Sequence, residues 1–226
     1  MCTFTVTVEV VPVLSVTHFV AFGDSITEGI LASGDLAANP YPAELKRQLT
    51  SRYSTQEFVV QNRGVGGERT TDGVRRFPGV LGADNPEVVL LFEGVNDLAQ
   101  GDQSQISVVI GNLRTMIQQA QGRGIRVFLG TLLPEIPGGS RTGPLPLIVP
   151  ANDQIRMLAA TQGATLVDLY QAFAGMERAL IGVDGLHPNE MGYQKIGETF
   201  FNAVRTRLET APTLTWTRFD QVHASR

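Results

Sequence analysis

The chain has 226 residues, 42% of them hydrophobic and 18% charged, which is enough for one well-filled domain and gives no sign of disorder. Its net charge of −4, without a clustered basic patch, argues against a nucleic-acid-binding surface. No stretch reaches the roughly 18 apolar residues of a membrane span, and the amino end lacks the regions of a signal peptide. The single cysteine, Cys2, cannot form an internal disulfide.

Residues 3–16 alternate polar and apolar side chains as far as Pro12, which is typical of a half-buried strand. An added edge strand, a linker and the end of a preceding β-domain all fit this pattern, and in the last case the native protein would be longer and could be exported. We expect an N-terminal extension or linker at residues 1–16, one α/β domain at 17–209 and a C-terminal tail without a clear period at 210–226. The sequence leaves the cellular location open.

From His18 onward, apolar runs typical of buried strands alternate with helix-like segments. This pattern predicts repeated βαβ units, and therefore an α/β fold with a parallel sheet and helices on both faces. The strands are expected near residues 18–23, 57–61, 87–93, 125–132 and 165–169.

Helices are indicated by apolar spacing and by their first residues. Pro42 suits the first turn of one helix, and apolar residues recur at helical spacing from Ile106 to Ala120. A further helix is expected from about Ala151. The last helix should open at Asn189 and bury one face, formed by Tyr193, Ile196, Phe200 and Val204.

The segment from Pro134 to Pro150 carries five prolines and three glycines, which predicts a long loop beside the carboxyl end of the fourth strand. Loops at that edge usually border the binding crevice. Two roles stay open for its apolar side chains, a wall for the substrate or a cover for the sheet edge. These side chains are Leu145, Leu147, Ile148 and Val149.

One serine follows the first buried strand directly, in the stretch Phe22-Gly23-Asp24-Ser25-Ile26-Thr27-Glu28-Gly29. Open α/β sheets bind ligands at the carboxyl ends of their strands, so Ser25 is expected in the crevice. By itself the tripeptide Gly-Asp-Ser is also an ordinary turn and helix cap.

A serine nucleophile needs a histidine base, and usually a carboxylate that orients the imidazole. The chain has three histidines. His18 begins the first strand, at the end of the sheet opposite the crevice, and His223 lies in the tail. His187 remains, and a tight turn at Gly185 would bring the carboxylate of Asp184 to its Nδ1 atom. The alternative is a surface loop that caps the last helix.

Oxyanion donors are the third requirement of this chemistry. The glycine-rich loop at residues 62–68 follows the second strand and frees backbone N–H groups. The loop Glu93-Gly94-Val95-Asn96-Asp97 follows the third strand and offers the side-chain amide of Asn96. Each loop taken singly could also be an ordinary turn.

The Gly-Asp-Ser stretch, the loop with Gly66, the loop with Asn96 and the segment with Asp184 and His187 follow one another in this order along the chain. Together these four motifs resemble the GDSL or SGNH hydrolase superfamily, whose second name denotes its serine, glycine, asparagine and histidine. The resemblance covers roughly residues 18–208. It implies that Ser25 is the nucleophile, His187 the general acid and base, and Asp184 the orienting carboxylate. It also implies an oxyanion hole formed by the N–H groups of Ser25 and Gly66 and the side chain of Asn96.

The resemblance further implies a three-layer flavodoxin-like fold with a five-stranded parallel sheet in the order 2-1-3-4-5, and neither a metal nor an organic cofactor. Ile26 stands in place of the leucine in the family's name, a tolerated apolar exchange. Gly67 stands where many members have serine, which leaves the shape of the acyl pocket open.

The expected function is hydrolysis of short-chain carboxylic esters, such as acetyl esters of carbohydrates or small alcohols, through an acyl-serine intermediate. A thioesterase or lysophospholipase is the alternative within the same chemistry. A catalytically silent flavodoxin-like binding module is the alternative from another class, because a fold does not determine a function. The oligomeric state stays open.

Overall fold

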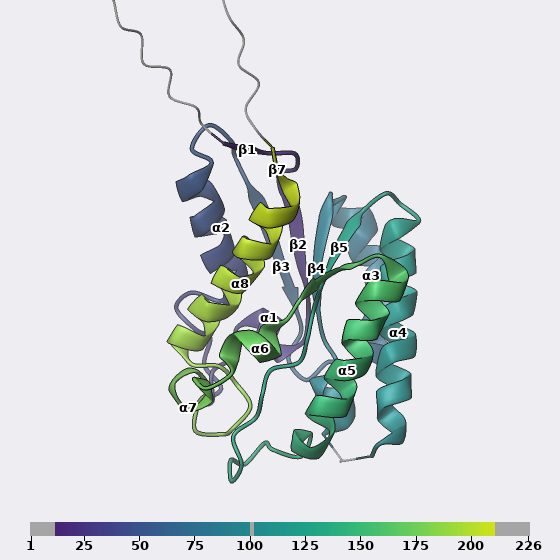
Figure 1. The fold of residues 1–226 in the computed structure, drawn as a ribbon, viewed down its shortest axis with the longest axis vertical. Coiled ribbons are helices and arrows are strands. Elements are labelled where there is room, and N and C mark those ends of the chain that lie inside the picture. Colours follow the sequence, from purple (N-terminus) through teal and green to yellow (C-terminus); the bar gives the residue numbers. More distant parts are fainter. Residues whose placement is uncertain (1–11, 100–101, 211–226) are drawn as a thin grey trace, which may run out of the picture.

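A parallel sheet forms the middle of the molecule and runs between two sets of helices (Figure 1). The computed structural model describes residues 12–99 and 102–210. The strands lie side by side in the order β3 (Val59–Gly64), β2 (His18–Gly23), β4 (Val88–Phe92), β5 (Arg126–Gly130) and β6 (Thr165–Val167). Numbered along the chain this order is 2-1-3-4-5, so the predicted parallel sheet and its strand order are confirmed.

The strands in the middle of the sheet are apolar because both of their faces are covered. All five residues of β4 are buried, and in β2 the exposed residue is His18, at the amino end away from the crevice, as predicted. β3 lies at the edge of the sheet and exposes Gln61, Asn62 and Arg63. The change in strand composition therefore follows each strand's place in the sheet.

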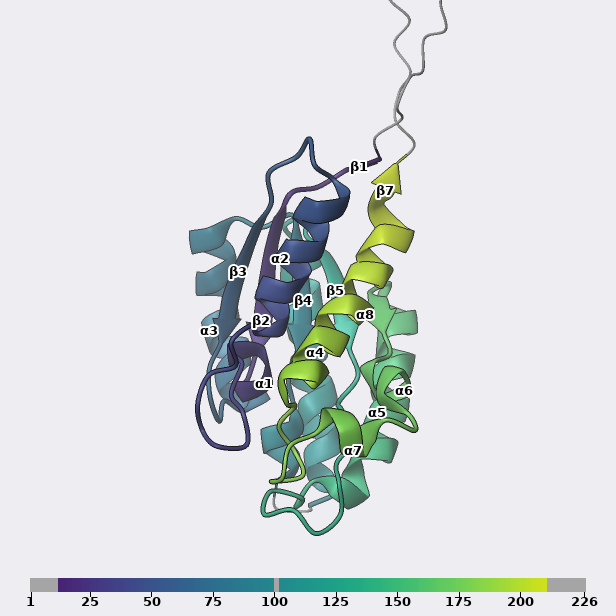
Figure 2. The same ribbon diagram turned by 90° about the vertical axis from the view of Figure 1, so that its left-hand side faces the viewer.

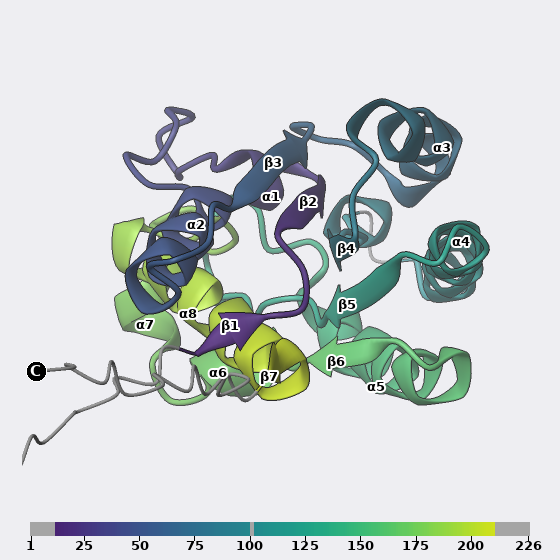
Figure 3. The ribbon, with the colours of Figure 1, turned by 90° about the horizontal axis from the view of Figure 1, so that it is seen from above.

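Helices cover both faces, which confirms the three predicted layers. On one face α2 (Tyr41–Arg52) packs against α8 (Glu190–Leu208), and both lie in front of the sheet in Figure 2. The other face is covered by α3 (Thr70–Asp84), α4 (Ser104–Gln121) and α5 (Leu145–Gln162). Figure 3 shows the sheet from above, between these two groups.

Short elements follow the carboxyl ends of three strands, β2, β4 and β6. They are α1 (Ser25–Glu28), the 3-10 helix η1 (Val95–Leu98), α6 (Leu169–Phe173) and α7 (Glu177–Leu180). The last long helix, α8, begins where the sequence predicts, because the side chain of Asn189 accepts a hydrogen bond from the Gly192 N–H at 3.0 Å.

The predicted loop from Pro134 to Pro150 is wrong for its last six residues, since α5 already begins at Leu145. Pro146 lies in the first turn of α5, where backbone N–H groups have no partner within the helix, so proline removes no hydrogen bond there. Leu147 and Ile148 belong to the buried core. Their burial supports the role of a cover for these two side chains, whereas Val149 of the same set is 50% exposed.

The described part of the predicted N-terminal strand lies outside the parallel sheet. β1 (Val13–Leu14) pairs antiparallel with β7 (Glu209–Thr210) in a separate two-stranded sheet, so it does not extend the edge of the parallel sheet. The rest of the predicted strand at residues 3–11, Cys2, and the tail beyond Thr210 lie outside the described residues. Within the described ranges, no helix has the length and hydropathy needed to cross a bilayer.

Candidate active site

Ser25 lies where a buried strand turns into a helix. β2 ends at Gly23, and Asp24 caps α1 by accepting a hydrogen bond from the Ile26 N–H at 3.0 Å. Ser25 is the first residue of α1 and is 7% exposed, while the neighbouring Ile26 packs into the core. The predicted position of the serine at the carboxyl edge of the sheet is confirmed, and isoleucine fills the apolar position beside it.

Ser25, His187 and Asp184 form one continuous chain of hydrogen bonds. The Ser25 Oγ atom lies 3.0 Å from His187 Nε2, and His187 Nδ1 lies 2.6 Å from Asp184 Oδ2. All three side chains are buried, although 162 positions separate Ser25 from His187. In this arrangement the imidazole can accept a proton from the hydroxyl while the carboxylate stabilises the resulting positive charge.

The carboxylate of Asp184 is held in its charged form. Burial by itself would raise its pKa, but hydrogen bonds from the His187 ring and from the N–H groups of Leu186 and His187 keep the pKa below its usual value. The guanidinium of Arg141 adds a weaker contact, with its Nε atom 4.0 Å from Asp184 Oδ2. Asp184 therefore presents a negative charge to the imidazole at neutral pH.

The loop that follows β5 supports the turn that carries this pair. The Ile136 N–H donates to the Gly185 carbonyl at 2.9 Å, and the Arg141 N–H donates to the Asp184 carbonyl at 3.0 Å. Gly185 has a φ of 82°, in the left-handed region that favours glycine, which confirms the predicted tight turn. The part of the loop that precedes α5 therefore does border the crevice, as its position predicts.

The predicted oxyanion donors lie on loops that follow three adjacent strands. Gly66 follows β3, Ser25 follows β2, and Asn96 follows β4 within η1. The Asn96 amide donates one hydrogen bond to the Glu68 carbonyl at 2.9 Å, which orients the amide and leaves its second N–H for another acceptor. Gly67 has a φ of 73°, and no atom lies within 4 Å of the place of a Cβ there, so the missing serine leaves open space.

Several buried carboxyl groups near this edge were not predicted. Burial raises the pKa of Asp24 to about 7, of Glu93 to about 9 and of Glu135 to about 8. Glu93 and Glu135 follow strands in the sequence, where a carboxylate usually faces solvent, so the sequence carried no signal of their burial. His223 lies outside the described residues.

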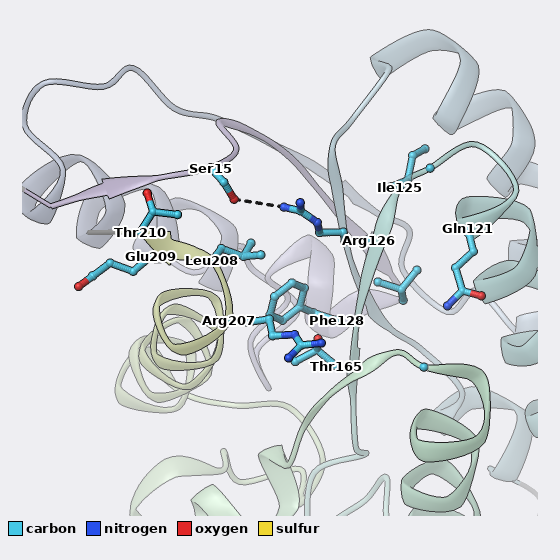
Figure 4. Close-up of a pocket in the computed structure, with 13 residues that line it drawn as sticks. Ser15, Gln121, Ile125, Arg126, Phe128, Thr165, Arg207, Leu208, Glu209 and Thr210 are labelled. Atoms are coloured by element: carbon cyan, nitrogen blue, oxygen red, sulfur yellow. Dashed lines mark hydrogen bonds between the residues drawn. The ribbon is translucent and has the colours of Figure 1, made fainter. Parts of the chain in front are cut away.

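A pocket of about 520 Å³ opens at the opposite end of the sheet, where β5 and β6 begin and α8 ends (Figure 4). Arg126 and Arg207 line it, and Arg126 donates a hydrogen bond to the Ser15 hydroxyl at 3.2 Å. Because its lining includes neither Ser25 nor His187, this pocket is separate from the candidate site. Among the described residues, no group of three or more His, Cys, Asp or Glu side chains could hold a metal ion.

Known proteins resemble this chain in sequence and in fold. The chain is 27% identical to esterase TesA of Pseudomonas aeruginosa over 169 residues, which are 74% of this chain and 77% of that protein. A lipase/acylhydrolase from Enterococcus faecalis superposes with a TM-score of 0.71 at 27% identity, covering 88% of this chain and all of the other. An acetylxylan esterase from Geobacillus stearothermophilus, at 20% identity, shares the fold with a TM-score of 0.71 over 84% of this chain and 94% of its own.

Residues 21–195 match the model of the GDSL-like lipase/acylhydrolase family, a span that contains Ser25, Asn96, Asp184 and His187. This match covers most of the domain, including four strands of the parallel sheet in full and β2 from Ala21 onward. The chain therefore belongs to the GDSL-like lipase/acylhydrolase family, and it is a carboxylic ester hydrolase.

Proposed function

We propose that the protein hydrolyses short-chain carboxylic esters with Ser25 as the nucleophile, His187 as general acid and base, and Asp184 as the orienting carboxylate. One observation carries the assignment, the unbroken chain from Ser25 Oγ to His187 Nε2 at 3.0 Å and from His187 Nδ1 to Asp184 Oδ2 at 2.6 Å. Serine is a weak nucleophile until a base removes its proton, and the His187 imidazole in this series of hydrogen bonds is that base.

In acylation, the Ser25 oxygen attacks the carbonyl carbon of the ester, and its proton passes to His187 Nε2. The Ser25 and Gly66 N–H groups and the Asn96 side chain stabilise the oxyanion of the tetrahedral intermediate. The intermediate collapses when His187 returns the proton to the leaving alcohol. Water, activated by the same imidazole, then attacks the acyl-serine and releases the carboxylic acid.

The substrate class is proposed from the relatives. Structural neighbours include acetylxylan esterases and a carbohydrate acetylesterase family member from Sinorhizobium meliloti. An acetyl ester of a carbohydrate or a small alcohol is therefore the expected substrate. A series of p-nitrophenyl esters from acetate to decanoate tests this, with kcat/KM expected to be highest for the shortest chains. A maximum at long chains would favour the lysophospholipase alternative, and faster hydrolysis of matched thioesters would favour a thioesterase.

The assignment of the nucleophile is tested with a fluorophosphonate probe, which reacts with activated serines. Labelling should map to Ser25 and disappear in Ser25→Ala, together with nearly all ester hydrolysis. Ser107→Ala is the matched control, because Ser107 is an exposed serine on α4 whose hydroxyl donates to the Ser104 carbonyl of its own helix. Retention of more than a tenth of the wild-type activity in Ser25→Ala would overturn the assignment.

A further inference from the structure

Glu93 is a buried carboxyl group that the proposed mechanism does not use. It follows the last residue of β4 and is 1% exposed. Neither of its carboxyl oxygens has a hydrogen-bond partner in the part of the chain that the structure describes. A charged carboxylate in such a place would lose its hydration without compensation, so an unpaired buried carboxyl group needs an explanation.

The fold provides a fitted place for this side chain. Gly73 of α3 faces Glu93, and a Cβ atom at residue 73 would lie 2.5 Å from both carboxyl oxygens. Any larger residue at position 73 would therefore displace the carboxyl group. Glu93 is enclosed between the carboxyl end of the sheet and α3, and it does not reach solvent.

The groups that face Glu93 are mostly acidic. Burial is the main cause that raises the pKa of Glu93 to about 9, and charges on Asp24, Glu68 and Asp97 raise it further. Arg76 of α3 opposes this effect. Its guanidinium is already held by the carboxylate of Glu68 and lies over the Phe22 ring, 4.0 Å from its centroid. Arg76 therefore compensates for Glu68 more than for Glu93.

Each acidic neighbour belongs to a loop that carries an expected oxyanion donor. Asp24 immediately precedes Ser25, and Asp97 immediately follows Asn96. The backbone carbonyl of Glu68 accepts the hydrogen bond that orients the Asn96 amide, and Glu68 itself is the last residue of the loop that contains Gly66. Glu93 thus lies among residues from all three donor loops.

We propose that Glu93 is a positioning residue that works as an uncharged carboxylic acid behind the three donor loops, and that its ionisation lowers the rate of ester hydrolysis. A negative charge there would repel the neighbouring carboxylates and oppose the negative charge that develops on the substrate oxygen, in a region from which water is excluded. The inference rests on the proposed function, because it assumes that these loops hold the oxyanion.

The first test compares the pH dependence of kcat in the wild type and in Glu93→Gln, after subtraction of uncatalysed hydrolysis. Glutamine is an uncharged substitute of nearly the same shape. In the wild type, kcat should fall about tenfold between pH 8 and pH 10, as expected for a group with a pKa of about 9. In Glu93→Gln it should fall by less than about twofold, with KM changed little in either protein.

Glu44→Gln is the matched control. Glu44 is also buried, but it is paired with Arg47 and Gln48 on α2, so its loss should leave the wild-type alkaline fall in place. A parallel fall in the wild type and in Glu93→Gln would overturn the proposal. If Ser25 reacts with the fluorophosphonate in both proteins, that result leaves the proposed nucleophile standing and removes only the role of Glu93.

A second measurement does not depend on activity. The infrared spectrum of the folded wild type at pH 7 should contain the C=O stretching band of a protonated carboxyl group that is missing in Glu93→Gln. The band should disappear as the pH rises to 10. Its absence at pH 7 would show that Glu93 is ionised in the working enzyme and would overturn the proposal, whatever the kinetic result.

Discussion

Acidic residues at the two ends of the sheet have opposite surroundings. At the amino end, Glu209 accepts a forked pair of hydrogen bonds from Arg52 and a third from the Tyr53 hydroxyl. These bonds, with Arg52 as the main cause, lower the pKa of Glu209 to about 2. At the carboxyl end, Glu93 and Glu135 have no such partners among the described residues, and burial raises the pKa of both.

The difference indicates where stability and function compete within one domain. A carboxylate with three donors favours the folded state, whereas a buried carboxyl group without donors opposes it at neutral pH. The unfavourable groups lie beside the loops of the candidate active site. Asp184 is the exception there, since its hydrogen bonds with His187 and the backbone keep it charged. Variants at the two ends should therefore respond in opposite ways.

The largest effect is expected from Asp184→Asn, which removes the paired charge at the carboxyl end. An amide beside Nδ1 favours the wrong tautomer of His187, so kcat should fall by up to about 10⁴. Steady-state kinetics on a short-chain ester, with circular dichroism as a check of folding, measure this. A folded variant with an unchanged rate would mean that Asp184 only shapes the loop.

A smaller loss is expected from Asn96→Ala, which removes one uncharged donor from the same edge. Loss of one oxyanion donor should lower kcat by about 10² to 10³ and leave KM nearly unchanged. Asn112→Ala is a suitable control, since the Asn112 amide on α4 bonds the Thr70 hydroxyl. If only KM rose in Asn96→Ala, Asn96 would be assigned to substrate binding.

The smallest effects are expected in the free energy of unfolding of one variant at each end of the sheet, Glu93→Gln and Glu209→Gln. The pKa of Glu93 is higher in the folded protein than its value of about 4.5 in the unfolded chain. The protonated side chain therefore contributes fully to the free energy of unfolding below pH 4.5, and this contribution is lost as the pH rises toward 9. Glu93→Gln should therefore gain about 2–3 kcal/mol in free energy of unfolding relative to the wild type between pH 5 and pH 7.

Glu209→Gln should have the opposite dependence. The pKa of Glu209 is lower in the folded protein than its value of about 4.5 in the unfolded chain, so the charged carboxylate stabilises the fold above pH 4.5. This contribution to the free energy of unfolding is lost as the pH falls toward 2. Since the ion pair is partly exposed, the variant should lose only about 1 kcal/mol or less at pH 7 and nothing at the acid limit. Urea unfolding at several pH values measures the free energy of unfolding of both variants relative to the wild type. If this difference changed with pH in the same direction for both variants, the distinction between the two ends of the sheet would be lost.

The sequence predicts those features of the molecule that depend on the pattern of neighbouring residues and on the order of strands and loops along the chain. The run Val-Val-Leu-Leu-Phe of β4 is apolar throughout because helices cover both faces, and Asp184 reaches His187 because one turn joins them. The serine and the histidine could be matched because parallel strands bring their following loops to one edge. These features need no knowledge of the distant packing.

Other features depend on contacts that no local pattern contains. The start of α5 was missed because prolines in a first helical turn resemble those of a loop. The pairing of β1 with β7 joins two segments at opposite ends of the chain. The burial of Glu93 depends on Gly73 of α3, so a carboxylate that reads as solvated in the sequence is enclosed in the fold.

The backbone hydrogen bonds between the loop after β5 and the Asp184–Gly185 turn also matter for protein engineering. They join main-chain atoms of Ile136 and Arg141 to the turn, so they do not depend on which side chains the loop carries. Position 139 is the exception to this independence from side chains, because a Cβ atom at Gly139 would lie 2.2 Å from the Asp184 carbonyl oxygen. A directed-evolution library that keeps Gly138, Gly139 and Arg141 and randomises the other exposed positions of this loop would therefore vary its side chains while the backbone support of the Asp184–Gly185 turn is retained.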